Sequence, residues 1–173
     1  MTEKSVPRVT FRRGKRIFNQ GDLGDRAYLI ERGQVAIIME SLRGPVMVET
    51  IGNRTIFGEM ALIDGSPRMA TAVAAEDTIC IVIKPAQLTK KLDGLPEQLR
   101  FTITAMMEYV RRTLPFDARK QFGPVTETAG DARIRKLLPS TAELSQLRWA
   151  DPTLKVVFEM IYDYTRRRLP PAP

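Results

Sequence analysis

The chain has 173 residues, of which 43% are hydrophobic and 27% charged, and this is the composition of a globular protein with a buried core. No segment approaches the roughly 18 uninterrupted apolar residues of a membrane-spanning helix, and residues 1–16 lack the apolar core of a signal peptide, so we expect a cytoplasmic protein without membrane insertion. The net charge of +7 is spread along the chain and marks no dedicated polyanion-binding segment.

The chain contains no histidine and a single cysteine. Because histidine is the commonest general base and the commonest metal ligand, this composition argues against hydrolytic and metal-assisted catalysis. Cys80 lies in the apolar run ICIVI, where a buried small side chain is favoured over a reactive thiol. With neither a nucleophile motif nor clustered carboxylates, we expect no enzyme, no catalytic residues, no metal site and no cofactor.

Residues 10–85 carry a strand pattern. Short apolar or alternating runs recur about every ten residues between glycine, proline, asparagine and aspartate, which is typical of an all-β barrel or sandwich. The runs are AYLIE, QVAIIM, VMVETI, TAVAA and TICIVI. We interpret residues 31–33 (ERG) as a tight hairpin turn and residues 41–45 (SLRGP) as a looser one. The prediction is an antiparallel β-roll, that is, a double-stranded β-helix or jelly roll.

After residue 95 the apolar period changes from about 2 to about 3.6 residues. Pro96 suits the first turn of a helix and Pro115 should end or kink it, so residues 97–114 are predicted to form a helix laid against the barrel. Its apolar face consists of Leu99, Ile103, Met106, Met107, Val110 and Leu114.

The last third of the chain predicts further helices after a connector at residues 117–131. Ser140 and Glu143 form a capping-box pattern for a short helix that reaches Leu147. Asp151 and Pro152 suit the cap and first turn of a longer helix, which covers residues 153–168. Its buried side is predicted to contain Leu154, Val157, Phe158, Ile161 and Thr165.

The predicted fold class is therefore α+β, an antiparallel β-roll with flanking helices and a C-terminal helical appendage. We place a β-roll domain at residues 1–115, and the connector with the helical appendage at residues 116–173.

The stretch FGEMALIDGSPRMATA, residues 57–72, combines features of an anion site. If residues 58–62 form one helical turn, its free backbone N–H groups can bind an anion, and Gly58 leaves the approach open. Arg68 can close on the same anion with a planar guanidinium, a geometry that suits phosphate. Glu59 only accepts hydrogen bonds, so it suits a hydroxyl group of the same ligand. A phosphate, a neighbouring hydroxyl and an apolar remainder together describe a nucleotide.

This stretch resembles the phosphate-binding cassette of the cyclic nucleotide-binding domain family. The family pattern is Phe-Gly-Glu, an apolar residue, Ala-Leu, a short loop, and then Pro-Arg, a small residue and Ala-Thr. The upstream stretch FNQGDLGDRAYLIERGQVAI is similar to the glycine-punctuated second and third strands of the family. The resemblance covers about residues 10–115 and includes no convincing DNA-binding domain.

The resemblance implies a ligand and a set of binding residues. The ligand would be cyclic AMP, with cyclic GMP as the alternative. Arg68 would bind the cyclic phosphate with help from backbone N–H groups near Ala61 and Ala70, and Glu59 would bind the ribose 2′-hydroxyl. The implied ligand-binding residues are Gly58, Glu59, Met60, Ala61, Arg68, Met69, Ala70 and Thr71.

Two features of the base-binding end depart from the family pattern or depend on position alone. The family usually has a small residue after the arginine, and a threonine there is associated with cyclic GMP. Met69 has no hydroxyl, which favours cyclic AMP, while its flexible thioether could fill space against either base. In this family the helix after the barrel often supplies a residue that caps the purine, and Tyr109, Arg112 and Phe116 are the candidates.

The resemblance implies three outputs, namely DNA binding, kinase inhibition and channel gating. We expect no channel gating by a chain without membrane spans. Kinase inhibition usually needs an inhibitory segment, and we expect none in the few residues before the barrel. The first hypothesis is a relay to a protein partner or a second copy through helices 97–114 and 153–168. The alternative is a cAMP-responsive DNA-binding regulator with a degenerate helix-turn-helix at 140–161, whose turn lacks glycine and whose second helix is mostly apolar.

Overall fold

The computed structural model describes residues 7–41, 44–113, 129–139 and 152–169. The chain divides into two compact units, residues 1–90 and residues 91–173, and each is described by itself. This boundary precedes the one expected between residues 115 and 116, because the helix at residues 97–113 has its packing partners in the second unit. The domain boundary at 115 stays a prediction.

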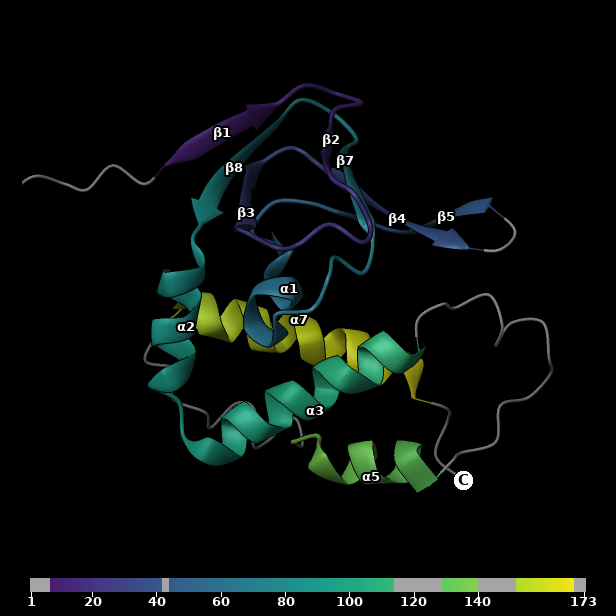
Figure 1. Ribbon diagram of the computed structural model, residues 1–173, viewed down its shortest axis with the longest axis vertical. Helices are drawn as coiled ribbons and strands as arrows, with labels where there is room; N and C mark the ends of the chain where they lie inside the picture. Colours follow the sequence, from purple (N-terminus) through teal and green to yellow (C-terminus); the bar gives the residue numbers. More distant parts are fainter. Residues whose placement is uncertain (1–6, 42–43, 114–128, 140–151, 170–173) are drawn as a thin grey trace, which may run out of the picture. The chain divides into compact units, whose positions relative to one another are not determined.

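The first unit is an antiparallel β-roll built from two four-stranded sheets (Figure 1). One sheet has the order β1 (Arg8–Phe11), β8 (Thr78–Ile83), β3 (Ala27–Arg32), β6 (Ile56–Phe57). The other has the order β2 (Arg16–Phe18), β7 (Thr71–Ala74), β4 (Val35–Ser41), β5 (Gly44–Ile51). The predicted fold class and the five predicted runs are confirmed, and β1, β2 and β6 are short strands that the pattern did not single out.

The turn predicted at residues 31–33 is present, but its interpretation as a hairpin was wrong. Strands β3 and β4, on either side of it, belong to different sheets and do not pair. Gly33 has a φ of 102°, and a Cβ there would lie 2.7 Å from the Asp77 carbonyl oxygen. The chain therefore crosses from sheet to sheet against the β7–β8 turn. By contrast, β4 and β5 do form a hairpin, which closes with Ser41 opposite Gly44.

The core of the first unit lies between the two sheets. An aromatic group runs through it, in which the Tyr28 ring packs against Phe11, Phe18 and Phe57 at centroid distances of 5.6, 6.5 and 5.2 Å. Other residues that point inward from the strands complete the core, as expected for sheets with one buried face. The buried members are Tyr28, Ile30, Val35, Ile51, Phe57, Ala72 and Cys80.

Two helices follow strands of this unit. Helix α1 (Glu59–Asp64) follows β6, and helix α2 (Pro85–Asp93) follows β8. Left-handed glycines bound α1 on both sides, Gly58 with φ of 77° and Gly65 with φ of 69°. Glycine adopts this conformation without the steric cost that a Cβ adds, so the two glycines fix where α1 begins and ends.

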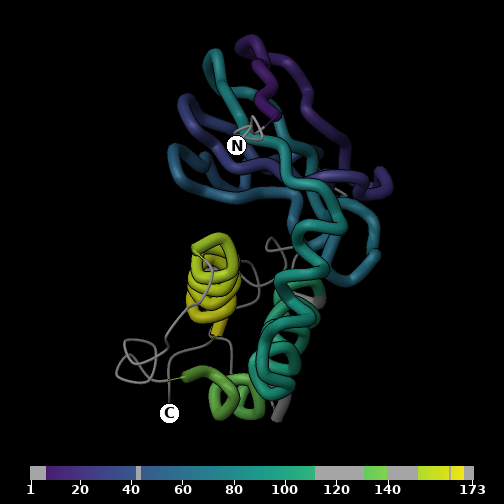
Figure 2. Tube along the Cα trace, turned by 90° about the vertical axis from the view of Figure 1, so that its left-hand side faces the viewer, coloured from purple at the N-terminus to yellow at the C-terminus, as the bar shows by residue number. Residues whose placement is uncertain are grey.

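The second unit contains α3 (Glu97–Thr113), α5 (Ala129–Leu137) and α7 (Pro152–Arg168). Helix α3 packs mainly against α7 and to a lesser extent against α5 (Figures 1 and 2). The predicted helices at 97–114 and 153–168 are confirmed within the described residues. The assignment of residues 129–131 to a connector was wrong, because α5 begins there. The predicted helix at 140–147 lies outside the described residues.

Most residues predicted for the apolar faces of α3 and α7 are buried. On α3, Ile103, Met106, Met107 and Val110 are almost inaccessible, and Leu99 is only half-buried. Leu114 lies outside the described residues. All five residues predicted for the buried side of α7, from Leu154 to Thr165, are buried. Among the described helices, none is long and apolar enough to cross a membrane.

Candidate functional site

The site is built on the connection between β6 and β7. After Phe57 the chain turns through the left-handed Gly58 into α1, leaves it through Gly65, and reaches Arg68 just before β7. The predicted helical turn at residues 58–62 is therefore present and extends to Asp64. The two left-handed glycines turn the chain back on itself, and this return brings Arg68 to the start of α1.

Arg68 is a buried cation whose side chain bonds to backbone carbonyls. Only 4% of the residue is exposed. Its Nη1 donates a hydrogen bond to the Gly58 carbonyl oxygen, and its Nη2 donates one of 2.6 Å to the Arg26 carbonyl oxygen. The Nε atom is buried and has no hydrogen-bond partner among the described residues. A buried N–H without a partner is costly, so this donor is suited to a ligand acceptor.

The charge of Arg68 is only partly balanced by the protein. Burial lowers the pKa of the guanidinium from its usual value, while Tyr28, Asp25 and Glu59 act in the opposite direction. Asp25 Oδ1 lies 4.0 Å from Arg68 Nη2, but Asp25 is largely exposed and its Oδ2 accepts two hydrogen bonds from Arg26. A desolvated cation with so long an ion pair to Asp25 favours the binding of an anion.

The β2–β3 loop holds the backbone of Arg68. Gly21 N donates to the Arg68 carbonyl oxygen at 2.9 Å, and Arg68 N donates to the Asp22 carbonyl oxygen at 2.8 Å. Gln20 N donates to Thr71 Oγ1 at 3.0 Å. The hydroxyl of Thr71, one of the predicted ligand-binding residues, therefore fixes this loop against the first residue of β7.

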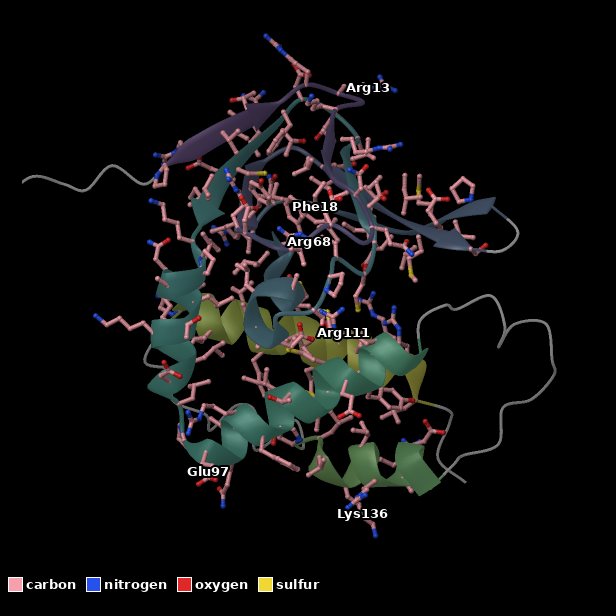
Figure 3. The ribbon with its side chains drawn as sticks, viewed as in Figure 1. Arg13, Phe18, Arg68, Glu97, Arg111 and Lys136 are labelled. Atoms are coloured by element: carbon pink, nitrogen blue, oxygen red, sulfur yellow. The ribbon has the colours of Figure 1, made fainter. Side chains whose placement is uncertain are left out.

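Two glycines allow the backbone to approach Arg68. A Cβ on Gly58 would lie 2.6 Å from Arg68 Nη1, and a Cβ on Gly24 would lie 2.6 Å from the Ala61 Cβ and 3.4 Å from Arg68 Cζ. The Phe18 ring covers the guanidinium, with Cζ 4.2 Å from the ring centroid (Figure 3). Sequence reasoning did not assign Phe18, Gly24 or Arg26 to the site, because these contacts join segments far apart in the chain.

The predicted site residues lie along the β6–β7 connection and the first residue of β7. Glu59, Met60 and Ala61 are buried in the first turn of α1, and Glu59 lies close enough to Arg68 to raise the pKa of its guanidinium. Met69 and Ala70 are half-buried. The structure thus brings Gly58, Glu59 and Arg68 together, while it places Met69 and Ala70 on the approach to β7.

Of the three candidates for capping a purine, only Tyr109 has a described side chain. Tyr109 is buried in the second unit, and its hydroxyl donates a 2.7 Å hydrogen bond to Asp131 Oδ1. The side chain of Arg112 and residue Phe116 lie outside the described residues. The capping role of these residues stays a prediction.

Other kinds of chemistry find little support in the described part of the chain. The described residues contain no group of three or more His, Cys, Asp or Glu side chains that could hold a metal ion. Cys80 is fully buried, and burial raises the pKa of its thiol to about 12. A thiol with so high a pKa is a poor nucleophile at neutral pH.

Comparison with known proteins identifies the family. The profile of the cyclic nucleotide-binding domain matches residues 8–94, about half of the chain, so the chain belongs to this family. The matched range contains both sheets of the β-roll, α1 and Arg68. The resemblance on which the sequence interpretation depended is therefore confirmed.

Two relatives illustrate the proteins that carry similar sequences. The cAMP-dependent protein kinase regulatory subunit of Debaryomyces hansenii is 46% identical over 75 residues, which are 43% of this chain and 16% of the relative. The cyclic AMP receptor protein of Thermus thermophilus is 43% identical over 72 residues, which are 41% of this chain and 33% of the relative. The chain thus spans at most about a third of the lengths of these curated relatives.

Solved structures with the same fold include two forms of the EAL enzyme Bd1971. Its cAMP-bound form gives a TM-score of 0.59 at 28% identity, over 66% of this chain and 32% of that chain. Its cGMP-bound form gives a TM-score of 0.60 at 26% identity, over 75% of this chain and 33% of that chain. These values support the same β-roll fold in both proteins.

Proposed function

We propose that this chain is a cyclic nucleotide sensor that binds cyclic AMP at residues 58–71. The observation that carries the proposal is Arg68, a buried guanidinium with an unpartnered Nε beside Gly58 and the start of α1. Among charged side chains, arginine is the one whose planar donor edge matches phosphate oxygens. A cyclic phosphate also carries a single negative charge, which would balance the positive charge of Arg68.

Glu59 extends the proposed recognition from the phosphate to the sugar. It is 3% exposed and lies in the first turn of α1, directly after Gly58. An ionised carboxylate accepts hydrogen bonds and repels phosphate, so its natural partner on a cyclic nucleotide is the ribose 2′-hydroxyl. Arg68 would donate hydrogen bonds to the phosphate, and Glu59 would accept one from the ribose hydroxyl. Together these two contacts would select a ribonucleotide over inorganic phosphate.

Cyclic AMP is the first choice of ligand, and cyclic GMP is the alternative. Met69 follows Arg68 directly and offers no hydroxyl to a guanine. Both nucleotides occur bound to Bd1971, and the Debaryomyces and Thermus relatives are named for cyclic AMP. Together these observations favour cyclic AMP as the preferred ligand, with incomplete discrimination against cyclic GMP.

The proposed output is a protein contact and no chemical reaction of the chain's own. Ligand binding at Arg68 would change what the residues after Ala61 pack against, and the helices of the second unit would carry the change to a partner protein or a second copy. Phe101 on α3 is 62% exposed and offers an apolar side chain for such a contact. The ligand needs only a few kcal/mol of differential affinity between two states to act as a switch.

The DNA-binding alternative has less support in α7. A helix that reads the major groove presents polar side chains in its N-terminal half. In α7 that half contributes Leu154, Val157 and Phe158 to the buried side, and Lys155 is close to Glu159 at 3.8 Å. The first helix of the supposed pair, at residues 140–147, lies outside the described residues.

Calorimetric titration tests the proposal directly. The purified chain is titrated with cyclic AMP and with cyclic GMP, in parallel with an Arg68→Ala variant and with Arg13→Ala as a control that removes an exposed arginine. We expect micromolar or tighter binding of at least one nucleotide, a loss of at least 100-fold in Arg68→Ala, corresponding to about 3 kcal/mol, and no change in Arg13→Ala. No binding of either nucleotide, or equal binding by Arg68→Ala, would overturn the proposal.

A further inference from the structure

The aromatic side chains of the β-roll pack in its core, and one of them, Phe18, also contacts Arg68. Phe18 ends β2, and its ring packs against both Tyr28 and Phe57 at centroid distances of 6.5 and 5.9 Å. The Arg68 guanidinium also lies over this ring, with Cζ 4.2 Å from the centroid. Figure 3 shows the two labelled side chains next to each other inside the first unit.

The contact restrains the guanidinium without using any of its donors. A cation over an aromatic face is attracted by the ring quadrupole, and this attraction uses no N–H donor. The N–H groups of Nη1 and Nη2 are directed by the carbonyl oxygens of Gly58 and Arg26. The ring contact and these two hydrogen bonds hold the guanidinium, while the Nε donor remains for a ligand.

A carboxylate in the place of the ring would hold Arg68 less usefully. It would neutralise the guanidinium and compete with an incoming phosphate for the same donors. In the described structure the carboxylate that approaches Arg68 Nη2, Asp25 Oδ1, is 4.0 Å away. An aromatic platform orients the cation and leaves its charge available to an anionic ligand.

The backbone strengthens the same arrangement. The loop that follows Phe18 forms two hydrogen bonds with the Arg68 backbone, through Gly21 and Asp22. Phe18 itself pairs with Ala72 of β7. Ring, loop and arginine are thus joined by direct contacts, and such preorganisation reduces the side-chain entropy that ligand binding costs.

We propose that Phe18 is a positioning residue for phosphate binding, which acts by holding the Arg68 guanidinium in its ligand-ready orientation. This inference rests on the proposed function, because it assigns Phe18 a part in cyclic nucleotide binding at the same site. It predicts that the aromatic face, and not merely an apolar side chain, is required at residue 18.

Two leucine variants separate positioning from packing. Phe18→Leu removes the ring that covers Arg68, whereas Phe11→Leu removes another ring of the same aromatic group, one that packs on Tyr28. We expect Phe18→Leu to weaken cyclic AMP binding about tenfold, and Phe11→Leu to leave it within about twofold, although both lower the midpoint of thermal unfolding. Phe18→Tyr, which keeps an aromatic face, should restore affinity to near that of the parent chain.

Equal weakening by the two leucine variants would overturn the inference, as would unchanged affinity in Phe18→Leu. A double-mutant cycle in the ligand-free chain decides the case in which the parent chain binds no nucleotide. The midpoints of urea unfolding are compared for Phe18→Leu, Arg68→Leu and the double variant. If the unfolding midpoint of the double variant falls by less than the sum of the falls in the two single variants, the Phe18–Arg68 contact is supported even though the proposed function fails. Additive losses overturn the positioning role itself.

Discussion

The Tyr109 hydroxyl donates a 2.7 Å hydrogen bond to Asp131 Oδ1 in the interior of the helical unit, and so joins α3 to α5. Both residues are 1% exposed. The same hydroxyl lies 3.3 Å from the carbonyl oxygen of Arg168, near the end of α7. One phenol therefore contacts all three described helices of this unit, and a buried polar group with such partners contributes to a specific arrangement of helices.

Replacing this phenol tests its contribution to stability. We expect Tyr109→Phe to reduce the free energy of unfolding by about 1 to 3 kcal/mol, because it removes a hydrogen bond to a buried carboxyl group. Urea unfolding followed by circular dichroism provides the measurement. Tyr162→Phe is a matched control, since it removes a 3.3 Å bond to the Pro139 carbonyl from a half-buried position and should cost less. A larger effect in the control would contradict the assignment.

Gly24 is expected to tolerate no side chain. In Gly24→Ala the new Cβ would lie 2.6 Å from the Ala61 Cβ and 3.4 Å from Arg68 Cζ, so the start of α1 must shift. We predict a loss of about 1 to 3 kcal/mol in unfolding free energy and about tenfold weaker cyclic AMP binding, measured by urea unfolding and calorimetry.

Two further variants check the cause of the Gly24 effect. Gly52→Ala places a Cβ no closer than 4.0 Å to the Gly33 carbonyl oxygen, and should bind like the parent chain. Ala61→Gly in the Gly24→Ala background removes the clashing atom and should recover part of the lost affinity. If the second substitution recovers none, the close contact is not the reason for the loss.

The role proposed for Glu59 can be tested on the ligand as well as on the protein. Glu59→Gln keeps the size of the side chain but weakens its acceptor strength, and we expect about tenfold weaker binding of cyclic AMP. With 2′-deoxy cyclic AMP, which lacks the hydroxyl, the parent chain and the variant should bind within about twofold of each other. Calorimetric titration of both ligands gives the comparison, and an equal effect of the substitution on both would refute the hydroxyl contact.

Asp77 should make stability depend on acid. Its Oδ1 accepts a 2.9 Å hydrogen bond from Arg13 N, and its Oδ2 accepts one of 2.7 Å from Arg12 Nη1. The bond from the Arg13 backbone and then that from Arg12 lower the pKa of this carboxyl group below its usual value. Because the folded state holds the proton less tightly than the unfolded state, the stabilisation is present above the ordinary carboxyl pKa and is lost as the pH falls through the lowered pKa.

The corresponding measurement is a series of urea unfolding midpoints from about pH 7 to about pH 2. The difference between the parent chain and Asp77→Asn should be greatest at neutral pH and should shrink towards the acid end. Glu76→Gln removes a negative charge from the same turn and leaves both Asp77 bonds in place, so it controls for net charge. A difference that grows on acidification would contradict the sign of the expected effect.

Much of the fold follows from local patterns in the sequence. Alternation and turn residues were enough to predict five strands, and the helical period predicted most of the buried face of α3 and all five residues named for that of α7. The pairing of strands was less accessible. The β3–β4 turn at Gly33 has the local signature of a hairpin. In the fold, however, β3 pairs with β8 and β6 while β4 pairs with β7 and β5, and these long-range pairings are not visible in the local sequence.

The site divides in the same way. The β6–β7 connection is continuous in sequence, so its motif could place Gly58, Glu59 and Arg68 in one group. Phe18 and the Arg26 carbonyl reach Arg68 only because β2 and β3 lie beside the strands that flank the motif. Helix α5 was missed because it has only nine residues, and so short a helix gives a weak periodic signal.

The burial of Cys80 has a practical consequence. It is the only thiol of the chain, it is fully inaccessible in the folded β-roll, and its pKa of about 12 keeps it protonated at the pH of common labelling reactions. A cysteine introduced at exposed Arg13, or at exposed Lys155 on α7, would thus be the single point of attachment for a fluorophore or spin label. The native chain is already a suitable background for site-specific spectroscopy, in which each unit can report separately on nucleotide binding.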